Sequence, residues 1–259
     1  MSHITGLSTA QLLAEPNLRL TEEQQEWFDN AIARLQNNEP IQHILGYTNF
    51  YSREFKCDRR ALIPRPETEE LVEWIINDWG MLNSQLSTLN SLDIGTGTGC
   101  IALSLAKELA NAEVTALDIS EEALSLAREN AELLSVENVK FVQGDILNHS
   151  SLHIPHSTFN IIVSNPPYVC KCEKVDMEAN VLDYDPHTAL FVSDENPLVF
   201  YRAIAEFGLE HLAPDGALYF EINQYLSQET CDLLVALGYK NVELRKDIND
   251  NPRMIKATL

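Results

Sequence analysis

A glycine-rich turn joins a predicted strand to a predicted helix at residues 91–102, Ser91-Leu92-Asp93-Ile94-Gly95-Thr96-Gly97-Thr98-Gly99-Cys100-Ile101-Ala102. The apolar residues before the turn are typical of a buried strand, and helical spacing begins after it. Because Gly95 and Gly97 have no Cβ, a ligand can approach the backbone of the turn closely. Phosphate loops and dinucleotide-binding folds use similar turns, but the lysine of a phosphate loop is absent here. The turn therefore predicts a ligand site without identifying the ligand.

Acidic residues end this strand and the next two predicted strands. Asp93 lies in the first strand, Asp118 ends the second, and Asp145 follows the third. Asp118 lies about 20 residues beyond the glycines, a spacing that places a carboxylate on ribose hydroxyls. Asp145 is expected to accept a hydrogen bond from an adenine amino group, with Ile146 against the adenine ring. A turn or cap role is the ordinary interpretation of any one of these acids, but together with the glycine turn they predict an adenosyl pocket.

Another buried strand ends in a rigid polar turn at residues 161–169, Ile161-Ile162-Val163-Ser164-Asn165-Pro166-Pro167-Tyr168-Val169. The two prolines prevent the strand from continuing and prevent entry into a helix. The Asn165 amide is therefore held at the carboxyl end of a buried strand, where ligands bind in parallel sheets. The plain alternative is a Pro-Pro turn that only closes the strand.

This polar turn suits methylation of a planar, weakly nucleophilic NH2 group. The lone pair of an amide or exocyclic amine is delocalised, so the nitrogen attacks a methyl group only when it is aligned and its N–H groups meet acceptors. The side-chain oxygen of Asn165 and the carbonyl oxygen of Pro166 are the candidate acceptors. Tyr168 is expected to stack on the planar group.

Three units are predicted along the chain. Residues 1–45 form a small helical unit, residues 46–66 a β-hairpin connector, and residues 67–259 a catalytic domain. In the last unit strands alternate with helices, which predicts a mainly parallel sheet with helices on both faces. The helices include those predicted at 121–134, 197–212 and 227–237. A long irregular segment at 170–196 is expected to be a binding lid, and a break is expected at 214–216.

The composition favours a protein or small-molecule substrate. The formal net charge is −21, and an acidic surface repels phosphate, so naked nucleic acid is disfavoured as the main partner. One basic cluster is the exception and is interpreted either as a partner contact or as scattered solvated charge. Its members are Arg53, Lys56, Arg59, Arg60 and Arg65.

Other features of the composition bear on the compartment and on metals. The N-terminus has no signal-peptide pattern, and no apolar run approaches the ~20 residues of a membrane span. The five scattered cysteines favour a reducing cytoplasm. No metal site is predicted, because the spacing of Cys170 and Cys172 does not suit zinc and the loop histidines are expected to be solvated.

From about Pro40 onward the chain resembles the bacterial release factor glutamine N5-methyltransferases, the HemK/PrmC family of class I S-adenosylmethionine-dependent methyltransferases. The glycine turn is shared by many methyltransferases, and Asn-Pro-Pro-Tyr is shared with adenine N6-methyltransferases. Pro64-Arg65-Pro66-Glu67-Thr68-Glu69 is the specific segment, since related ribosomal-protein glutamine methyltransferases have a Pro-Arg-Ser-Pro type segment there. The other matching segments are residues 39–46, Asp185-Pro186, Ala189-Leu190, Glu221 and Gln224.

The resemblance implies a Rossmann-like domain with a mainly parallel seven-stranded sheet. It also implies methyl transfer from S-adenosylmethionine to the side-chain amide nitrogen of the glutamine in the Gly-Gly-Gln motif of class 1 peptide-chain release factors. The product would be S-adenosylhomocysteine, and the reaction would support translation termination. The family normally has further N-terminal helices, so a shortened docking unit is expected.

The resemblance also assigns roles to residues of this chain. The implied catalytic and substrate-binding residues are Asn165, Pro166, Pro167 and Tyr168. The implied cofactor-binding residues are Gly95, Thr96, Gly97, Thr98, Gly99, Asp118, Ile146 and Asn165, and the strand-end pattern adds Asp93 and Asp145. Ile146 stands where an aromatic residue is often seen, so weaker packing against adenine is expected.

Two other functions remain open at this point. An adenine N6-methyltransferase acting on DNA or RNA would share the Asn-Pro-Pro-Tyr turn, but the net charge and the lack of a separate basic domain count against it. A non-catalytic adenosine-binding protein would have no need for a turn that grips an amide.

Overall fold

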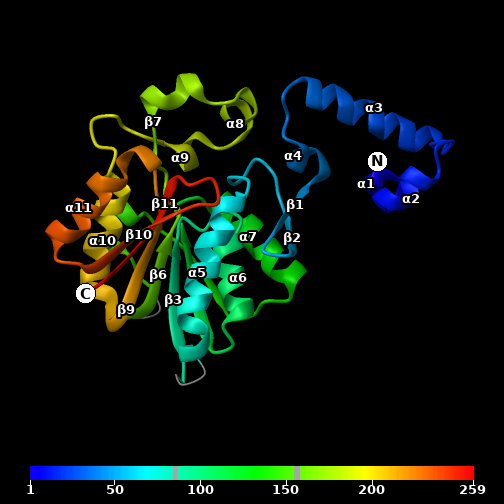
Figure 1. Ribbon diagram of the computed structural model, residues 1–259. Coiled ribbons are helices and arrows are strands. Elements are labelled where there is room, and N and C mark those ends of the chain that lie inside the picture. The colour runs from blue at the N-terminus through cyan, green and yellow to red at the C-terminus, as the bar shows by residue number, and fades with distance from the viewer. Residues whose placement is uncertain (84–86, 155–157) are drawn as a thin grey trace.

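The computed structural model describes residues 1–83, 87–154 and 158–259 (Figure 1). A seven-stranded sheet lies at its centre in the order β10-β11-β9-β6-β3-β4-β5. Strands β9, β6, β3, β4 and β5 pair in parallel, whereas β11 pairs antiparallel with both β9 and β10. The predicted α/β fold with a mainly parallel seven-stranded sheet is therefore confirmed. The strands are β3 (Leu89–Ile94), β4 (Ala112–Asp118), β5 (Val139–Gln143), β6 (Phe159–Ser164), β9 (Leu212–Glu221), β10 (Lys240–Lys246) and β11 (Pro252–Thr258).

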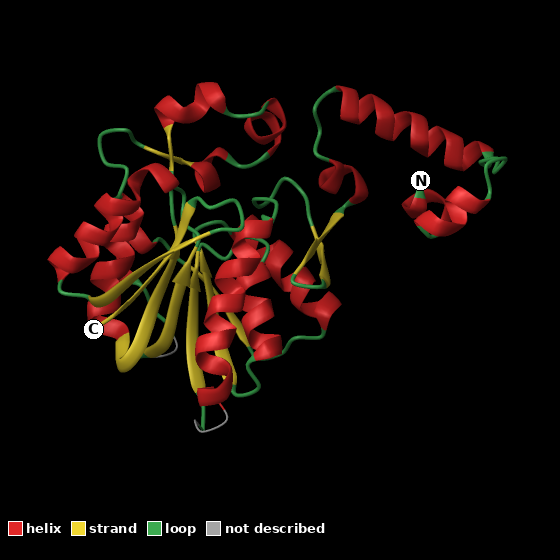
Figure 2. Ribbon diagram, in the orientation of Figure 1, coloured by secondary structure: helices red, strands yellow, loops and turns green. Residues whose placement is uncertain are grey.

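Helices cover both faces of this sheet (Figure 2). The central strand β6 carries the apolar run Ile161-Ile162-Val163 because both of its faces are buried. Ile161 and Val163 belong to one hydrophobic cluster with α5, α6 and α7, and Ile162 belongs to the cluster on the opposite face with α10 and α11. The helices are α5 (Pro66–Asn83), α6 (Cys100–Glu108), α7 (Glu121–Leu134), α10 (Val199–His211) and α11 (Ser227–Leu237).

Short helices and a hairpin precede this α/β unit. The helices are α1 (Ser2–Thr5), α2 (Thr9–Ala14), α3 (Glu22–Gln36) and α4 (Ile41–Leu45), and the hairpin pairs β1 (Tyr47–Phe50) with β2 (Arg53–Lys56). Thr21 begins α3 with a capping box, in which its side chain accepts from the Gln24 N–H while the Gln24 side chain accepts from the Thr21 N–H. Ala31 is the buried residue of α3, so most of this helix remains on the surface.

The structure corrects two predictions. The segment expected to be irregular at 170–196 contains η2 (Lys171–Asp176), α8 (Ala179–Tyr184), α9 (His187–Leu190) and a parallel pair of short strands, β7 (Val169–Cys170) and β8 (Phe191–Val192). Each is too short to show a hydrophobic period. The break expected at 214–216 lies inside β9, where the register with β6 shifts beside Gly216. A Cβ at Gly216 would lie 2.9 Å from the carbonyl oxygen of Ala213.

No helix in the described part of the chain is long and apolar enough to cross a membrane.

Two helical glycines provide a matched test of the packing. A Cβ at Gly208 in α10 would lie 2.3 Å from the hydroxyl of Tyr239, which is buried and donates to the Ala205 carbonyl at 2.8 Å. Gly208→Ala should therefore lower the free energy of unfolding by about 1–3 kcal/mol through overpacking. Gly80 in α5 has open space around it, so Gly80→Ala should raise that free energy by about 0.5–1 kcal/mol. Urea denaturation measures both values, and equal effects would contradict the packing of α10.

Candidate active site

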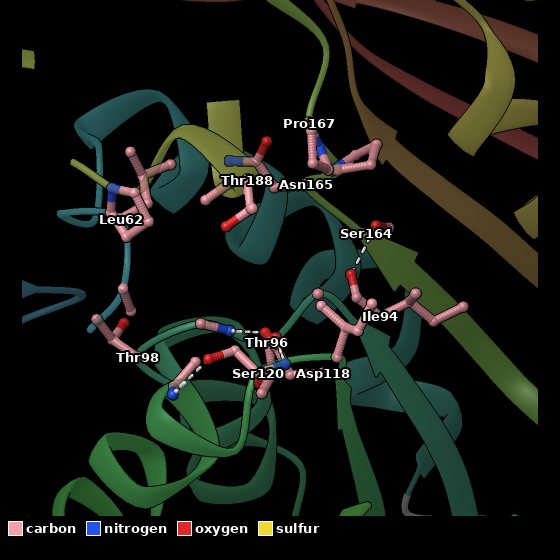
Figure 3. Close-up of a pocket in the computed structure, with 18 of the residues that line it drawn as sticks. Leu62, Ile94, Thr96, Thr98, Asp118, Ser120, Ser164, Asn165, Pro167 and Thr188 are labelled. Carbon is pink, nitrogen blue, oxygen red and sulfur yellow. Dashed lines mark hydrogen bonds between the residues drawn. The ribbon is translucent and has the colours of Figure 1, made fainter. Parts of the chain in front are cut away.

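A cavity of about 500 Å³ opens at the carboxyl ends of the central strands (Figure 3). The glycine turn follows β3, Asp118 ends β4, Asp145 and Ile146 follow β5, and Asn165 follows β6. Parallel strands bring these residues together because their carboxyl ends lie at one edge of the sheet. Figure 3 shows Thr96, Asp118 and Ser120 on one side of the cavity and Asn165, Pro167 and Thr188 on the other.

Left-handed backbone shapes the glycine turn. Gly95, Gly97 and Gly99 have φ values of 75°, 55° and 82°, which residues with a Cβ rarely adopt. Gly95 and Gly97 line the cavity together with Thr96 and Thr98. Gly99 serves the packing of α6, because a Cβ there would lie 3.2 Å from the Cβ of Ala127.

Asp118 is fixed by the turn that it faces. Its Oδ2 accepts from the Gly97 N–H at 2.9 Å, and its Oδ1 accepts from the Ser120 N–H at 2.9 Å. Burial raises the pKa of Asp118, while these backbone N–H groups oppose that shift. Each carboxylate oxygen has a further lone pair, so Asp118 can still accept from two neighbouring hydroxyls of a ligand.

Asp145 and Ile146 also lie on the cavity wall. The Asp145 side chain caps η1 (Ile146–Ser151) by accepting from the Leu147 N–H at 2.9 Å. Ile146 is buried and offers an apolar surface. Asp145 therefore caps η1 through Oδ1, and its Oδ2 is available to a ligand.

Asp93 is placed differently from the prediction. It is fully buried beneath the turn and is not one of the described residues that line the cavity. Its Oδ2 accepts from the Thr96 hydroxyl at 2.7 Å and from the Ala102 N–H at 3.2 Å. Asp93 thus supports the turn from behind and does not face the cavity, because the residues of β3 alternate between the faces of the sheet and its side chain enters the side covered by α6.

Asn165 and the two prolines line the cavity as predicted. The Asn165 side-chain Nδ2 donates to Thr68 Oγ1 at 3.3 Å, and the carbonyl oxygen of Asn165 lies 4.0 Å from the position of a Cβ on Gly95. The Asn165 turn therefore lies close to the glycine turn.

Tyr168 does not take the predicted position. It is not among the described residues lining the cavity but packs on a hydrophobic cluster and donates its hydroxyl to Glu221 Oε1 at 3.0 Å. Burial raises its pKa well above the usual range. The prolines turn the chain and direct Tyr168 back towards β9, so its ring packs away from the cavity wall.

Several residues that line the cavity were not predicted, because they do not lie at the ends of strands. Thr68 comes from the first turn of α5, residues 61–65 come from the segment before it, and Thr188 and Ala189 come from α9. The resemblance to a known family marked the segments that contain Thr68 and Ala189 but assigned them no role. Of the described residues, no cluster of His, Cys, Asp and Glu could hold a metal ion.

Carboxylates of the chain pair with every member of the basic cluster. These ion pairs are Arg53–Glu108, Lys56–Glu129 (3.2 Å), Arg59–Glu39 (3.8 Å), Arg60–Asp58 (2.7 Å), Arg60–Glu129 (2.6 Å) and Arg65–Asp185 (2.8 Å). Most are partly buried pairs near the surface, where a single ion pair contributes little. The cluster therefore joins the hairpin to neighbouring elements and is a poor candidate for a free basic surface.

Contacts of Tyr184 connect the cavity to the N-terminal helices. The Tyr184 hydroxyl donates to the Asn37 carbonyl at 2.9 Å, and the Arg59 guanidinium lies 4.6 Å from the centre of the Tyr184 ring. The next residue, Asp185, is buried and pairs with Arg65. Because Thr188 follows shortly after, a wall of the cavity is held by both the hairpin segment and α3.

The chemistry of the cavity fits an adenosyl ligand with an amino-acid tail. Asp118 has free lone pairs that would suit ribose hydroxyls, Ile146 and Leu117 offer apolar surface that would suit a ring, and the glycines permit close approach to the backbone. A family profile described as a methyltransferase domain matches residues 86–258, and a profile of the PrmC N-terminal domain matches residues 1–46. Fold, site and profiles together define a class I S-adenosylmethionine-dependent methyltransferase.

Curated relatives identify the family. The release factor glutamine methyltransferase of Flavobacterium psychrophilum is 48% identical over 251 residues, which cover 97% of this chain and 86% of that protein. That of Bacteroides thetaiotaomicron is 47% identical over 252 residues, which cover 97% and 87%. The chain belongs to the family of release factor glutamine methyltransferases.

Solved structures agree on the fold alone. A methyltransferase from Pyrococcus furiosus has a TM-score of 0.53 at 19% identity, over 88% of this chain and 97% of that chain. A human methyltransferase 10 domain containing protein has a TM-score of 0.55 at 18% identity, over 79% and 88%.

Cofactor affinity tests the role of Asp118. Asp118→Ala removes the acceptors proposed for ribose hydroxyls, so S-adenosylmethionine binding should weaken by about 1–3 kcal/mol. Isothermal titration calorimetry measures the loss. Glu113→Ala, an exposed acid in the same strand, is the control and should bind with wild-type affinity. Unchanged affinity in Asp118→Ala would contradict the assignment of this cavity.

The pH dependence of stability tests the position of Asp93. Burial, with a smaller contribution from the charge of Asp118, raises the pKa of Asp93 to about 7. The folded state therefore holds this proton more tightly than the unfolded chain, so stability is lost as pH rises from about 4 to about 7, by at most about 4 kcal/mol. Asp93→Asn should remove this loss, and its melting temperature should rise relative to wild type between pH 5 and pH 8 by an amount that grows with pH. A difference that does not vary with pH would contradict the buried position.

Proposed function

We propose that this chain transfers a methyl group from S-adenosylmethionine to the side-chain amide nitrogen of the glutamine in the Gly-Gly-Gln motif of class 1 peptide-chain release factors. The observation that carries the proposal is Asn165 with Pro166 in the cavity wall opposite Asp118, on a backbone that two prolines stiffen. Membership of the release factor glutamine methyltransferase family supports the same substrate. A substrate that works in translation implies a cytoplasmic enzyme.

The residues of the chain act mainly by orientation and electrostatics. S-adenosylmethionine, when bound, supplies an electrophilic methyl group. The Asn165 side-chain oxygen and the Pro166 carbonyl oxygen accept hydrogen bonds from the amide N–H groups, which aligns the nitrogen and favours the positive charge that develops on it. Proline has no N–H, so Pro166 and Pro167 add no competing donor. The apolar cavity wall limits the access of water.

A glutamine side chain alone provides little binding energy, so the release factor must also contact the enzyme elsewhere. The N-terminal helices carry exposed apolar side chains, among them Leu13, Ile32 and Leu35. Their link to the wall through Tyr184 and Asn37 supports a docking role for this unit.

Labelled S-adenosylmethionine distinguishes the candidate substrates. Incubation with an intact release factor should label its Gly-Gly-Gln glutamine, and incubation with DNA or RNA should leave the nucleic acid unlabelled because the net charge of −21 disfavours its approach. Asn165→Ala should reduce turnover by about 10²–10³-fold through loss of a preorganised acceptor. Its cofactor affinity, measured by calorimetry, should stay within a few-fold of wild type.

Methylation of adenine in nucleic acid, or turnover of Asn165→Ala close to that of wild type, would contradict the proposed function. A short Gly-Gly-Gln peptide serves as the control for remote contacts and should be a much poorer substrate than the whole factor.

A further inference from the structure

A buried chain of hydrogen bonds lies behind Asn165. Glu221 ends β9 and is buried, and its Oε2 accepts from the Thr68 hydroxyl at 2.6 Å. Its Oε1 accepts from the Tyr168 hydroxyl at 3.0 Å. Thr68 is buried in the first turn of α5, and its Oγ1 accepts from Nδ2 of Asn165 at 3.3 Å. Residues far apart in the sequence thus converge on the side chain that faces the substrate.

The direction of this chain is fixed at its buried end. A carboxylate only accepts hydrogen bonds, so Glu221 requires the proton of the Thr68 hydroxyl. A hydroxyl has one proton, and once it is donated the Thr68 oxygen can only accept from its other neighbour. The NH2 group of Asn165 must therefore face Thr68, which leaves Oδ1 of Asn165 directed to the cavity. Shape alone would not select this orientation, because the oxygen and nitrogen of a side-chain amide are nearly equal in size.

We infer that Glu221, acting through Thr68, is a positioning residue that orients the Asn165 amide so that it presents an acceptor to the substrate. Tyr168 holds the other oxygen of the Glu221 carboxylate and so fixes its rotation. The inference deepens the proposed function and rests on it, because an acceptor is useful only if the substrate group donates. The inferred orientation of Asn165 also explains how the site would select a glutamine side chain over a glutamate side chain.

The selectivity follows from counting donors. A glutamine amide brings N–H groups that the Asn165 oxygen and the Pro166 carbonyl can accept, whereas a glutamate carboxylate brings acceptors only and meets oxygen atoms. Sites built around hydrogen bonds of one polarity discriminate strongly, because a mismatched buried group stays unpaired. Glu221 therefore determines which of two nearly isosteric side chains enters the cavity.

The contact with Thr68 supports the carboxylate form of Glu221. Burial raises the pKa of Glu221 overall, and the hydrogen bonds from Thr68 and Tyr168 and the charge of Arg253 oppose that shift. The 2.6 Å distance between Thr68 Oγ1 and Glu221 Oε2 is typical of a hydroxyl that donates to a charged oxygen.

Glu221→Gln tests the direction of the chain with little change in shape. The new amide can direct its NH2 group at Thr68 while its oxygen still accepts from Tyr168, which allows Thr68 to donate to Asn165 and the Asn165 amide to rotate. Thr68→Val breaks the chain with an isosteric side chain, and Thr68→Ser retains the hydroxyl and should restore the wild-type values. Thr230→Val is the matched control, because Thr230 is a buried threonine whose hydroxyl donates to the Leu226 carbonyl at 2.7 Å, outside the site.

Calorimetry should compare binding of the release factor with that of its Gln→Glu variant at the methylated position. Wild type and Thr230→Val should prefer glutamine at least about tenfold, and this ratio should fall towards one in Glu221→Gln and Thr68→Val. Turnover should drop about 10–100-fold in the same two variants, with S-adenosylmethionine affinity within about twofold of wild type.

The outcomes separate the inference from the proposed function. If wild type binds and methylates the glutamine form but folded Glu221→Gln or Thr68→Val keeps the wild-type preference, the positioning role is wrong. If wild type itself neither prefers nor methylates the glutamine form, the proposed function is wrong. Should Glu221→Gln fail to fold, the ratio measured with Thr68→Val decides.

Discussion

The parallel pairing of β3 with β6 is the constraint on which the site depends. Ile94 lies opposite Ser164, and the Ser164 hydroxyl donates to the Ile94 carbonyl at 2.6 Å, which fixes the register at the end of both strands. The next residues are Gly95 and Asn165. A shift of one residue would exchange the faces of β6 and move Asn165 away from the glycine turn. The cofactor half and the amide half of the cavity are therefore aligned by backbone pairing, before any side chain of the site makes a contact.

Buried carboxylates at the ends of strands serve different purposes in this molecule. Asp93 supports the glycine turn from behind, Asp118 faces the cavity while held by backbone N–H groups, and Glu221 orients the polar side chains on the substrate side. Each carboxylate lies at the end of a strand of the sheet. The three differ in the groups that donate hydrogen bonds to them. Each carboxylate accepts hydrogen bonds from hydroxyl or backbone N–H groups, which offset part of the cost of its burial.

Sequence patterns predicted well what depends on local interactions. Helices α7 and α11 have the predicted bounds, because hydrophobic periodicity is encoded within a few residues. The glycine turn, Asp118 and Asn165 were found for the same reason. Tyr168 was misplaced because its partner, Glu221, lies 53 residues away, and the role of Thr68 was missed because Glu221 lies 153 residues from it. Contacts between residues so far apart in the sequence leave no local pattern. The alternation along β3 places Asp93 on one face of the sheet, but the sequence alone does not show which face lies beneath the turn.

The position of β11 has a consequence for how the enzyme assembles. This strand is made after β9 and β10, yet it lies between them and pairs Met254 with Glu221. During synthesis β9 therefore cannot pair with β11 until residues 252–258 have emerged from the ribosome. The carboxylate end of β9 gains its final environment only in that last step, so a nascent chain can complete its cofactor turn early but its amide-binding side late.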